Sequence, residues 1–298
     1  MDYKKYVNID LHIHSSASDG TLSSSEILIQ ARKQNLGAIA ITDHDSIEGS
    51  RKAICAGIPP PLKFLTGVEI SATPPPDFFC SGSFHILGYG IKLNDPVLNQ
   101  TLEMLQKARR NRNPQILNRL NHLGMTLSLK EVENEVSEGL IGRPHIACLM
   151  VKKGFVKSID DAFDRYLGKD KPAYVNKFRI DCERAIETIA KAGGISVLAH
   201  PLLLNIEQYE IMEDLIVTLK SMGLNGLEVY YPNHTPEHID HYAALARRHD
   251  LLMTGGTDFH GLLKPDIQMG SGKGNLNIPF ELYERIVENT KNETNRFF

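Results

Sequence analysis

Cysteine is scarce in this sequence, and long apolar runs are missing from it. The four cysteines are scattered and form no C-x-x-C pair, so neither a disulfide framework nor a zinc knuckle is indicated. No apolar stretch reaches the roughly 18 residues that a membrane helix needs. The first residues, MDYKKYVNIDLH, also lack the apolar segment of a signal peptide. We therefore expect a cytoplasmic protein in a reducing compartment, with no membrane association.

An excess of charge of either sign is missing as well. The formal net charge is −3, and the charged share of 23% and apolar share of 42% are ordinary for a globular protein. Such a chain has no overall attraction to nucleic acid or anionic membranes, so any site for a polyanion must be local. The length suits one large domain, or one domain that carries an insertion. Nothing in the sequence indicates an obligate protein partner.

Seven short β-rich runs recur along the chain, and several alternate with helical patterns. After the first run, Ser23 and Glu26 form a capping box that begins a helix, and Gly37 suits its end. Strands that alternate with helices predict a parallel α/β fold. The runs lie at residues 7–13, 37–45, 63–70, 84–90, 194–201, 226–232 and 251–258.

Polar side chains stand at nearly every predicted strand end. An open, doubly wound sheet gathers such groups chiefly at one switch point, whereas a (β/α) barrel brings the carboxyl ends of all its strands to one mouth. The pattern therefore favours a barrel. The strand-end motifs are HIHS, TDHD, GVEIS, HILGY, AHP, YYP and TDFH.

Residues 97–180 interrupt this rhythm and are richer in arginine and lysine than the flanking segments. We predict a small helical insertion domain beside the barrel mouth. It would divide the barrel into an N-terminal part, residues 1–96, and a C-terminal part, residues 181–298. The expected helices are separate and short, in PVLNQTLEMLQKARRNRN, PQILNRLNHLG, SLKEVENEVSEG, RPHIACLMVKKG and SIDDAFDRYLG.

Imidazole and carboxylate groups, the common ligands of zinc, manganese and iron, fall at the predicted strand ends. A single histidine on a strand is more often structural, and an H-x-H pair such as His12 and His14 leaves both interpretations open. The distant D-x-H pair and the acid at the end of GVEI favour the metal interpretation. Nine groups exceed the needs of one tetrahedral ion and match two or three divalent ions with shared ligands. They are His12, His14, Asp19, His44, Glu69, His85, His200, Asp258 and His260.

Other histidines have less support as ligands. Thr235 and Pro236 suit the N-cap and first turn of a helix, so His238 and His241 are expected on its solvated face. His234 precedes that helix and could lie at the barrel mouth.

Three acids near the predicted ligands are expected to support them. Asp10 shares a strand face with His12, but its depth suggests a place behind the ligands. Asp43 and Asp45 flank His44 on the opposite face, where solvent or loop hydrogen bonds are expected to satisfy them. No nucleophile motif accompanies the serines of HSSASDG, so a Ser-His-Asp mechanism is not indicated.

Several of these motifs together resemble the polymerase-and-histidinol-phosphatase (PHP) family of metal-dependent phosphoesterases. They are DLHIHSSASDGTLS, ITDHDSIEG, GVEIS, HILGYG, AHP and GGTDFHG, and the resemblance covers nearly the whole chain in order. The segment GRPHIACLMVKKGFVKSIDDAFDRYLGKDKPAYV is similar to a narrower branch. That branch includes the 3′,5′-nucleoside bisphosphate phosphatases and the 5′→3′ exoribonucleases that act on short RNA.

This resemblance implies a distorted (β/α)7, TIM-like barrel that holds two to three divalent ions. The ligand types suit Mn, Zn or Fe, with Mg as a further candidate. All nine positions carry residue types that match the family. The implied ligands are His12, His14, Glu69 and Asp258 for the first ion, Glu69, His85 and His200 for the second, and Asp19, His44 and His260 for the third.

We therefore expect a phosphoric ester hydrolase that acts on a small nucleotide, such as a nucleoside 3′,5′-bisphosphate that it converts to the 5′-monophosphate. The expected step is attack by metal-bound hydroxide, because metal binding lowers the pKa of water from about 15.7 towards about 7. The insertion is expected to bind the second phosphate through cationic and imidazole groups. The candidates are Arg143, His145, Lys171, Arg112 and His234.

Two alternatives remain open. The same site could serve a 5′→3′ exoribonuclease on short oligoribonucleotides, since a 5′-terminal nucleotide with its 3′-phosphodiester resembles the bisphosphate. The absence of a long basic groove with interleaved aromatic residues favours short substrates. The other alternative is a non-catalytic, metal-stabilised module associated with a polymerase, although structural zinc sites are usually closed and built with cysteine.

Overall fold

The computed structural model describes residues 8–135 and 139–296 of the chain. The first predicted strand begins at Val7, which lies outside these residues. All seven predicted strands are present and are hydrogen-bonded in the order β1-β2-β3-β4-β6-β7-β8, with an additional strand, β5, beside β3. The strands are β1 (Ile9–Ile13), β2 (Ala38–Ile41), β3 (Lys63–Thr73), β4 (His85–Tyr89), β5 (Ile180–Asp181), β6 (Ile195–Leu198), β7 (Gly226–Tyr230) and β8 (Leu252–Gly255).

The two edges of this sheet meet, which makes it a nearly closed barrel. Ile13, the last residue of β1, and Phe259 beyond β8 form a parallel bridge. The backbone N–H of His14 donates to the carbonyl of Phe259 at 2.9 Å. The predicted distorted (β/α)7 barrel is confirmed. Part of the distortion is that β1 and β8 meet through this bridge rather than through a continuous ladder of hydrogen bonds.

Strand β4 runs against its neighbours, so the prediction of a wholly parallel sheet was wrong. It pairs antiparallel with both β3 and β6. The reason lies in the connection, because residues 74–84 are too few for the helical crossover of a dozen or more residues that a parallel strand needs. His85, at the start of β4, therefore lies at the same end of the barrel as the carboxyl ends of the parallel strands.

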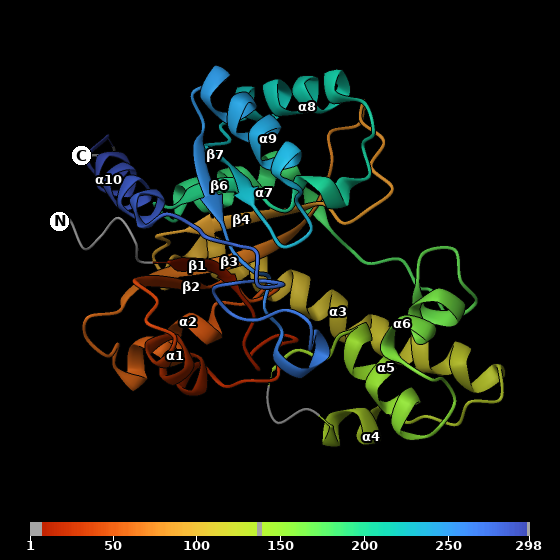
Figure 1. Ribbon diagram of the computed structural model, residues 1–298. Coiled ribbons are helices and arrows are strands. Elements are labelled where there is room, and N and C mark those ends of the chain that lie inside the picture. Colours follow the sequence, from red (N-terminus) through yellow and green to blue (C-terminus); the bar gives the residue numbers. More distant parts are fainter. Residues whose placement is uncertain (1–7, 136–138, 297–298) are drawn as a thin grey trace.

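Helices cover the outside of the barrel (Figure 1). The predicted capping box of Ser23 and Glu26 is present at the start of α1. Gly37 does not end this helix as predicted. Asn35 takes the left-handed conformation, with a φ of 56°, which asparagine tolerates better than most residues. The helices of the barrel are α1 (Ser24–Lys33), α2 (Glu48–Ala56), α7 (Cys182–Lys191), α8 (Tyr209–Ser221), α9 (Pro236–Arg248) and α10 (Phe280–Arg296), of which α2 and α10 were not predicted.

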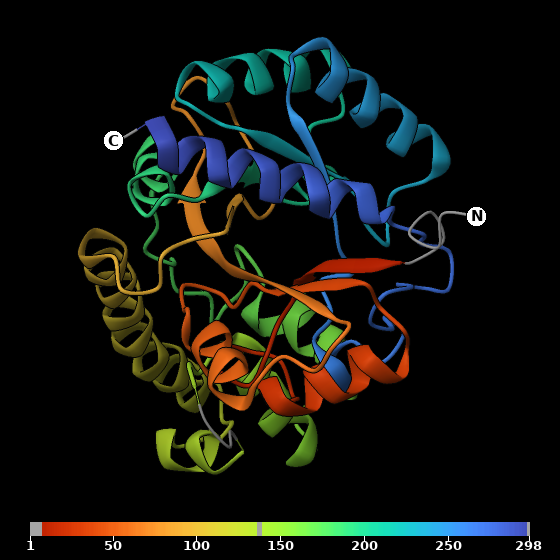
Figure 2. The same ribbon diagram turned by 90° about the vertical axis from the view of Figure 1, so that its left-hand side faces the viewer.

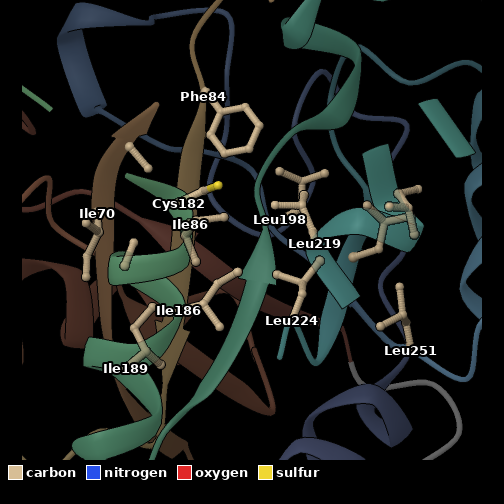
Figure 3. Packing of buried hydrophobic residues seen from close by; sticks show 14 of the residues in the cluster. Ile70, Phe84, Ile86, Cys182, Ile186, Ile189, Leu198, Leu219, Leu224 and Leu251 are labelled. Atoms are coloured by element: carbon tan, nitrogen blue, oxygen red, sulfur yellow. The ribbon is translucent and has the colours of Figure 1, made fainter. Parts of the chain in front are cut away.

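The largest apolar cluster lies between the sheet and helices α7 and α8. Ile70 and Ile86 on neighbouring strands contact the same cluster as Ile186 and Ile189 of α7 (Figure 3). All four are essentially inaccessible to solvent, and each contributes roughly 1.5–3 kcal/mol through burial. This packing fixes the strands whose ends carry the predicted ligands.

A second apolar cluster fills the barrel at the end away from the ligands. It combines Leu11 of β1 and Val197 of β6 with Leu282 and Ile286 of α10. Figure 2 shows α10 lying across this end of the barrel. Side chains thus close this end of the barrel, and only the opposite end is open to a ligand.

The helical insertion begins with one long helix, α3 (Pro96–His122), where two short helices were predicted. Pro114 lies inside it without ending it, although proline removes one backbone hydrogen bond. Both halves of the helix are anchored. Leu98 and Leu102 pack on the barrel cluster, whereas Ile116 and Leu120 belong to a separate apolar cluster of the insertion.

The rest of the insertion packs on the second half of α3, to one side of the barrel (Figure 1). Residues 136–138, inside a predicted helix, lie outside the described residues. The domain limits at residues 97 and 180 stay predictions, since α3 contacts both the barrel and the insertion.

No helix in the described ranges is long and apolar enough to cross a membrane. The remaining elements are α4 (Leu129–Asn134), α5 (Arg143–Lys152), α6 (Ile159–Ala162), the π-helix η2 (Phe163–Leu167), and two 3-10 turns of the barrel, η3 (Pro201–Leu204) and η4 (Gly261–Leu263).

Candidate metal centre

The nine predicted ligands all lie at the open end of the barrel, on segments far apart in the sequence. His12 belongs to β1, Glu69 to β3 and His85 to β4, and the others follow the ends of β1, β2, β6 and β8. Eight of the nine are buried, and the side chain of His44 is 14% exposed. Contacts among these side chains join them into one cluster.

One oxygen of Glu69 faces three imidazoles. Its Oε2 lies 2.7 Å from Nδ1 of His44 and 3.3 Å from Nε2 of His14. It also lies 3.6 Å from Nε2 of His12. Three nitrogens around one carboxylate oxygen leave room for a cation that all of them could bind.

The other oxygen of Glu69 faces two further imidazoles. Its Oε1 lies 2.8 Å from Nδ1 of His85 and 2.9 Å from Nε2 of His200. These two nitrogens are 3.3 Å apart. Glu69 therefore has the geometry of a bridging ligand, with one oxygen toward each of two groups of histidines.

Asp19 and Asp258 complete the cluster on its outer side. Oδ1 of Asp19 lies 3.6 Å from Nδ1 of His14 and 3.5 Å from Nε2 of His260. Oδ1 of Asp258 lies 3.2 Å from Nε2 of His14. The remaining oxygen of Asp258 accepts a hydrogen bond from the hydroxyl of Tyr231 at 3.0 Å.

The cluster has the donor set of a multinuclear metal site. The cluster contains three groups of three or four residues. Within each group, every residue has one ligand atom that lies within 4.8 Å of the ligand atoms of the others. Five buried atoms of the cluster that face another of its members lack a hydrogen-bond partner among the described residues, and each such atom costs about 1–3 kcal/mol unless something satisfies it. Divalent cations would satisfy them all. The atoms are Nε2 of His12, Nε2 of His14, Oδ1 of Asp19, Nδ1 of His44 and Oε2 of Glu69.

The electrostatics agree with a site for cations. Burial opposes ionisation of Glu69, yet the imidazoles of His44 and His85 hold its pKa well below the usual range. Burial opposes a charge on His14 too, but the carboxylates of Asp258 and Glu69 raise its pKa to about 9. The carboxylates therefore attract positive charge, which a proton or a metal ion can supply.

A buried glutamate behind the cluster, which was not among the predicted residues, orients two of its members. Oε1 of Glu228 lies 2.9 Å from Nδ1 of His12, and its Oε2 accepts from the backbone N–H of His200 at 2.6 Å. The first contact leaves Nε2 of His12 free to face Glu69. A lone acid inside the apolar run GLEVY was the available signal.

The three flanking acids are all buried and all hydrogen-bonded. Asp10 accepts from the backbone N–H groups of His12 and Thr257, so it supports the ligands from behind as predicted. Asp43 accepts from the hydroxyl of Ser15 at 2.7 Å, and the serines of that loop thus hold it. Asp45 accepts from the backbone N–H of Ser71 at 2.8 Å. Of the two predicted roles for Asp43 and Asp45, loop hydrogen bonding is confirmed and solvation was wrong.

A cavity of about 350 Å³ joins the cluster to the insertion. Six cationic side chains line it; Lys264 pairs with Asp258 of the cluster, and we call the other five the cationic wall. They come from α3, from the start of α5 and from the segment that returns from the insertion to β5. The cationic wall consists of Arg109, Arg112, Arg143, Lys177 and Arg179.

Two members of the cationic wall share one carboxylate. Nη2 of Arg109 donates to Oδ2 of Asp45 at 2.9 Å, and Nζ of Lys177 lies 3.7 Å from the same oxygen. Lys177 also donates to the hydroxyl of Ser71. Burial and the nearby guanidinium of Arg109 lower the pKa of Lys177 to about 7.

The other arginines of the cationic wall form no ion pair with a described carboxylate. Arg112 donates to the carbonyl of Val175 and Arg143 to that of Leu167, each at 2.8 Å. Arg143 is also held by two aromatic rings, whose centroids lie 5.2 and 5.6 Å from its Cζ. Burial and the neighbouring Arg143 charge lower the pKa of Arg112 to about 10. This part of the wall is therefore positive and prearranged for an anion.

Comparison with known proteins agrees with this geometry. The family model of the PHP domain matches residues 10–167. A 5′-3′ exoribonuclease from Haemophilus influenzae is 34% identical over 257 residues, which cover 86% of this chain and 90% of that protein. The chain belongs to the PHP family.

Two further likenesses cover most of this PHP protein. A 3′,5′-nucleoside bisphosphate phosphatase from Chromobacterium violaceum is 32% identical over 261 residues, which cover 85% of this chain and 87% of that protein. A solved structure from Bifidobacterium adolescentis, described as a metal-dependent phosphoesterase, has a TM-score of 0.84 at 29% identity and covers 95% of this chain and 96% of its own. The predicted class of metal-dependent phosphoesterases is confirmed.

The five predicted substrate-binding residues of the PHP protein fall into two groups. Arg112 and Arg143 line the cavity. His145 is buried beside it, and its Nδ1 accepts from the backbone N–H of Gly142, which caps α5. His234 is also buried, with Nδ1 bonded to the carbonyl of Val229, and Lys171 is exposed; like His145, neither of these two lines the cavity.

Lys177 and Arg179, which were not among the predicted residues, line the cavity instead. They lie on a segment without regular secondary structure, between η2 and β5. Their place depends on the path that the chain takes from the insertion back to the barrel. Apart from their charge, no local pattern distinguishes them from surface residues.

Proposed function

We propose that this PHP protein is a phosphatase that removes the 3′-phosphate from a nucleoside 3′,5′-bisphosphate and leaves the 5′-monophosphate. The observation that carries the proposal is the pairing of two charged regions in one cavity. The metal cluster is suited to the phosphate that is cleaved. Across the same cavity, Arg112 and Arg143 offer guanidinium groups without carboxylate partners, which suits a second phosphate.

The chain's own residues have distinct tasks in this reaction. Divalent ions, when bound, activate water at neutral pH and neutralise charge on the phosphoryl oxygens. Glu69 would bridge two ions, and Glu228 would keep His12 oriented toward them. Arg112 and Arg143 would hold the uncleaved phosphate and so place the other one at the cluster.

We further propose three ions, of Mn, Zn, Fe or Mg, with the ligands divided as the family resemblance implies. His12, His14, Glu69 and Asp258 would hold one, and Glu69, His85 and His200 the second. Asp19, His44 and His260 would hold the third, and His14 lies close enough to join them. The contacts of Oε1 and Oε2 of Glu69 with separate histidines support this division.

A second candidate function is 5′→3′ exonuclease activity on short oligoribonucleotides. The relative from Haemophilus influenzae, whose name states this activity, favours it. The 5′-terminal nucleotide of an RNA carries a phosphate at its 5′ end and a phosphodiester at its 3′ position. The same two charged regions could therefore receive it.

Four cysteines without a disulfide bond support the proposal that the protein works in a reducing, cytoplasmic compartment. Cys55 is exposed, and neither it nor Cys80, Cys148 or Cys182 forms a disulfide. Disulfides are rare in such compartments.

A phosphate-release screen on metal-reconstituted protein tests the proposal. It compares nucleoside 3′,5′-bisphosphates, nucleoside 5′-monophosphates, histidinol phosphate and short 5′-phosphorylated RNAs. The proposal expects the highest kcat/KM with a bisphosphate, whereas nucleotide release from RNA at a higher kcat/KM would favour the exonuclease. If no ester is cleaved, the non-catalytic, polymerase-associated module becomes the better explanation.

Matched variants test the two regions of the cavity separately. Arg112→Ala should raise KM for a bisphosphate much more than for a simple monoester, whereas Arg110→Ala, an exposed neighbour, should change neither. His14→Ala and Asp258→Ala should lose bound metal and activity together. Activity that survives both of these changes contradicts the assigned metal centre.

A further inference from the structure

The cavity has a third region, which neither the metal cluster nor the cationic wall includes. Ile159 and Asp160 of α6 and Phe163 of η2 all line it. Asp160 and Phe163 are three residues apart, and Ile159 and Phe163 are four apart. At these spacings the three side chains share one face of the helical segment. We call this face the α6 face.

Asp160 is an unusual member of a cavity that has a cationic wall. Among the described lining residues it is the only carboxylate outside the metal cluster. It is exposed, and no described group forms a hydrogen bond or ion pair with its side chain. Its carboxylate can therefore meet a ligand in the cavity.

Helix capping does not account for Asp160. The hydroxyl of Ser158 accepts from the backbone N–H of Asp161 at 3.1 Å, and the carboxylate of Asp161 accepts from that of Lys157 at 2.9 Å. These two residues satisfy the start of α6. An acid in the first turn also interacts favourably with the helix dipole, but this interaction does not depend on which way the acid faces.

The chemistry of the α6 face selects the part of a nucleotide that can bind there. An ionised carboxylate only accepts hydrogen bonds, so it repels phosphate and needs an N–H or O–H donor. Phe163 and Ile159 present apolar surface beside it, with the Phe163 ring also in contact with the guanidinium of Arg143. An aromatic side chain can stack on the face of a base. A nucleobase combines a flat apolar face with N–H groups at its edge.

We propose that the α6 face binds the nucleobase of the substrate and that Asp160 selects bases by their N–H donors. This inference rests on the proposed nucleotide substrate. Guanine offers two adjacent N–H donors to the two carboxylate oxygens, whereas adenine and cytosine offer one amino group each. The single ring N–H of uracil lies between two carbonyl oxygens, which the carboxylate repels. The order of preference is guanine, then adenine and cytosine, then uracil.

The test compares kcat/KM for the four ribonucleoside 3′,5′-bisphosphates, for the 2′-deoxyguanosine compound and for a base-free ribose bisphosphate. In the unmodified protein the guanosine compound should exceed the uridine compound about tenfold or more, since a hydrogen bond to a charged group is strong. Asp160→Asn should bring the two within about threefold. Asp164→Asn, an exposed acid one turn later, is the matched control and should keep the order.

Each remaining outcome contradicts the inference in a distinct way. Equal rates for all bases in the unmodified protein would show that no base is recognised. If Asp160→Asn raises kcat/KM for every compound, including the base-free one, Asp160 acts only by repelling phosphate. A ribose preference over deoxyribose that disappears in Asp160→Asn, without any base order, would assign the 2′-hydroxyl as its partner.

A binding measurement separates this inference from the proposed function. Calorimetry with guanosine and uridine 5′-monophosphates on metal-loaded protein needs no turnover. Suppose that no bisphosphate is cleaved, but that guanosine monophosphate binds more tightly than uridine monophosphate and loses this advantage in Asp160→Asn. This result supports base binding at the α6 face and contradicts the phosphatase proposal. If bisphosphates are cleaved and the two monophosphates bind with equal affinity, the phosphatase proposal is supported and the base site is contradicted.

Discussion

Oε1 of Glu228 lies 2.9 Å from Nδ1 of His12, and both side chains are inaccessible to solvent. Because Nδ1 of the imidazole is engaged, its other nitrogen, Nε2, faces the carboxylates of Glu69 and Asp258. A carboxylate behind a ligating histidine fixes the orientation of the ring and makes it a stronger metal ligand. Glu228 also accepts from the backbone N–H of His200, so one carboxylate supports two parts of the candidate metal centre.

Glu228→Gln is therefore expected to weaken metal binding although Glu228 is not itself a proposed ligand. The amide has only one acceptor oxygen, so it cannot serve both the ring of His12 and the N–H of His200. A loss of about 10- to 100-fold in metal affinity is typical when such a supporting group is removed. Metal titration followed by elemental analysis measures it. Glu213→Gln, a carboxylate that pairs with Arg248 outside the cavity, is the control, and equal retention by both variants would contradict the role.

The proposed metal ligands were predictable from the sequence because each lies in a recognisable strand or in the loop beside it. Strand ends are close in the sequence to the apolar runs that define them, and a barrel gathers those ends whatever the details of its loops. The position of His85 shows the limit of this argument. It begins its strand rather than ending it, and it joins the cluster only because β4 is antiparallel. The short connection of residues 74–84 contained that information.

Metal removal is expected to lower the thermal stability of the protein. Each ion that binds the folded chain alone stabilises it, by about 2.7 kcal/mol when its concentration is 100 times its Kd. Without ions, the buried imidazoles and carboxylates lose these partners. Thermal unfolding before and after chelation should therefore differ by several degrees, roughly 5 °C or more. The difference should shrink in His14→Ala and persist in His122→Ala, an exposed histidine; a difference that is equal in both would place the stabilising ion elsewhere.

The cationic wall was less predictable than the metal ligands. Arg112 and Arg143 were found because they stand in or beside recognisable helices. Lys177 and Arg179 were missed and Lys171 was chosen in their place, although all three lie in the same stretch. Which lysine of an irregular segment turns inward depends on contacts with distant residues, here Asp45 and Ser71. Local sequence carries no information on such contacts.

Substrate binding is expected to weaken as the pH rises through about 7, because Lys177 loses its proton in that range. Burial and the guanidinium of Arg109 lower its pKa to about 7, so its positive charge is present below this pH and absent above it. KM for a bisphosphate should rise between pH 7 and 9. Lys177→Arg keeps the charge at every pH and should flatten the profile, whereas Lys177→Met should give a high KM throughout. A rise of the same size in Lys177→Arg would assign the titration to another group.

Asp45 and Arg109 are expected to act as a structural link between the barrel and the insertion. Both side chains are buried, and their 2.9 Å contact joins the loop after β2 to the middle of α3. Removing one partner of a buried ion pair leaves the other charge uncompensated, which costs about 3–5 kcal/mol. Asp45→Asn should therefore lower the free energy of unfolding by about that amount.

The double variant distinguishes the link from the separate contributions of the two residues. In Asp45→Asn/Arg109→Met neither member of the pair is left as a lone charge, and Lys177 loses its contact with Asp45 in the single and the double variant alike. The loss should therefore be smaller than the sum of the two single losses by about 1–3 kcal/mol. Glu281→Gln breaks an exposed pair with Arg285 and should cost no more than about 1 kcal/mol. Urea unfolding measures all four variants. Strict additivity would mean that the insertion is attached chiefly through the apolar side chains of α3, such as Leu98 and Leu102, rather than through this pair.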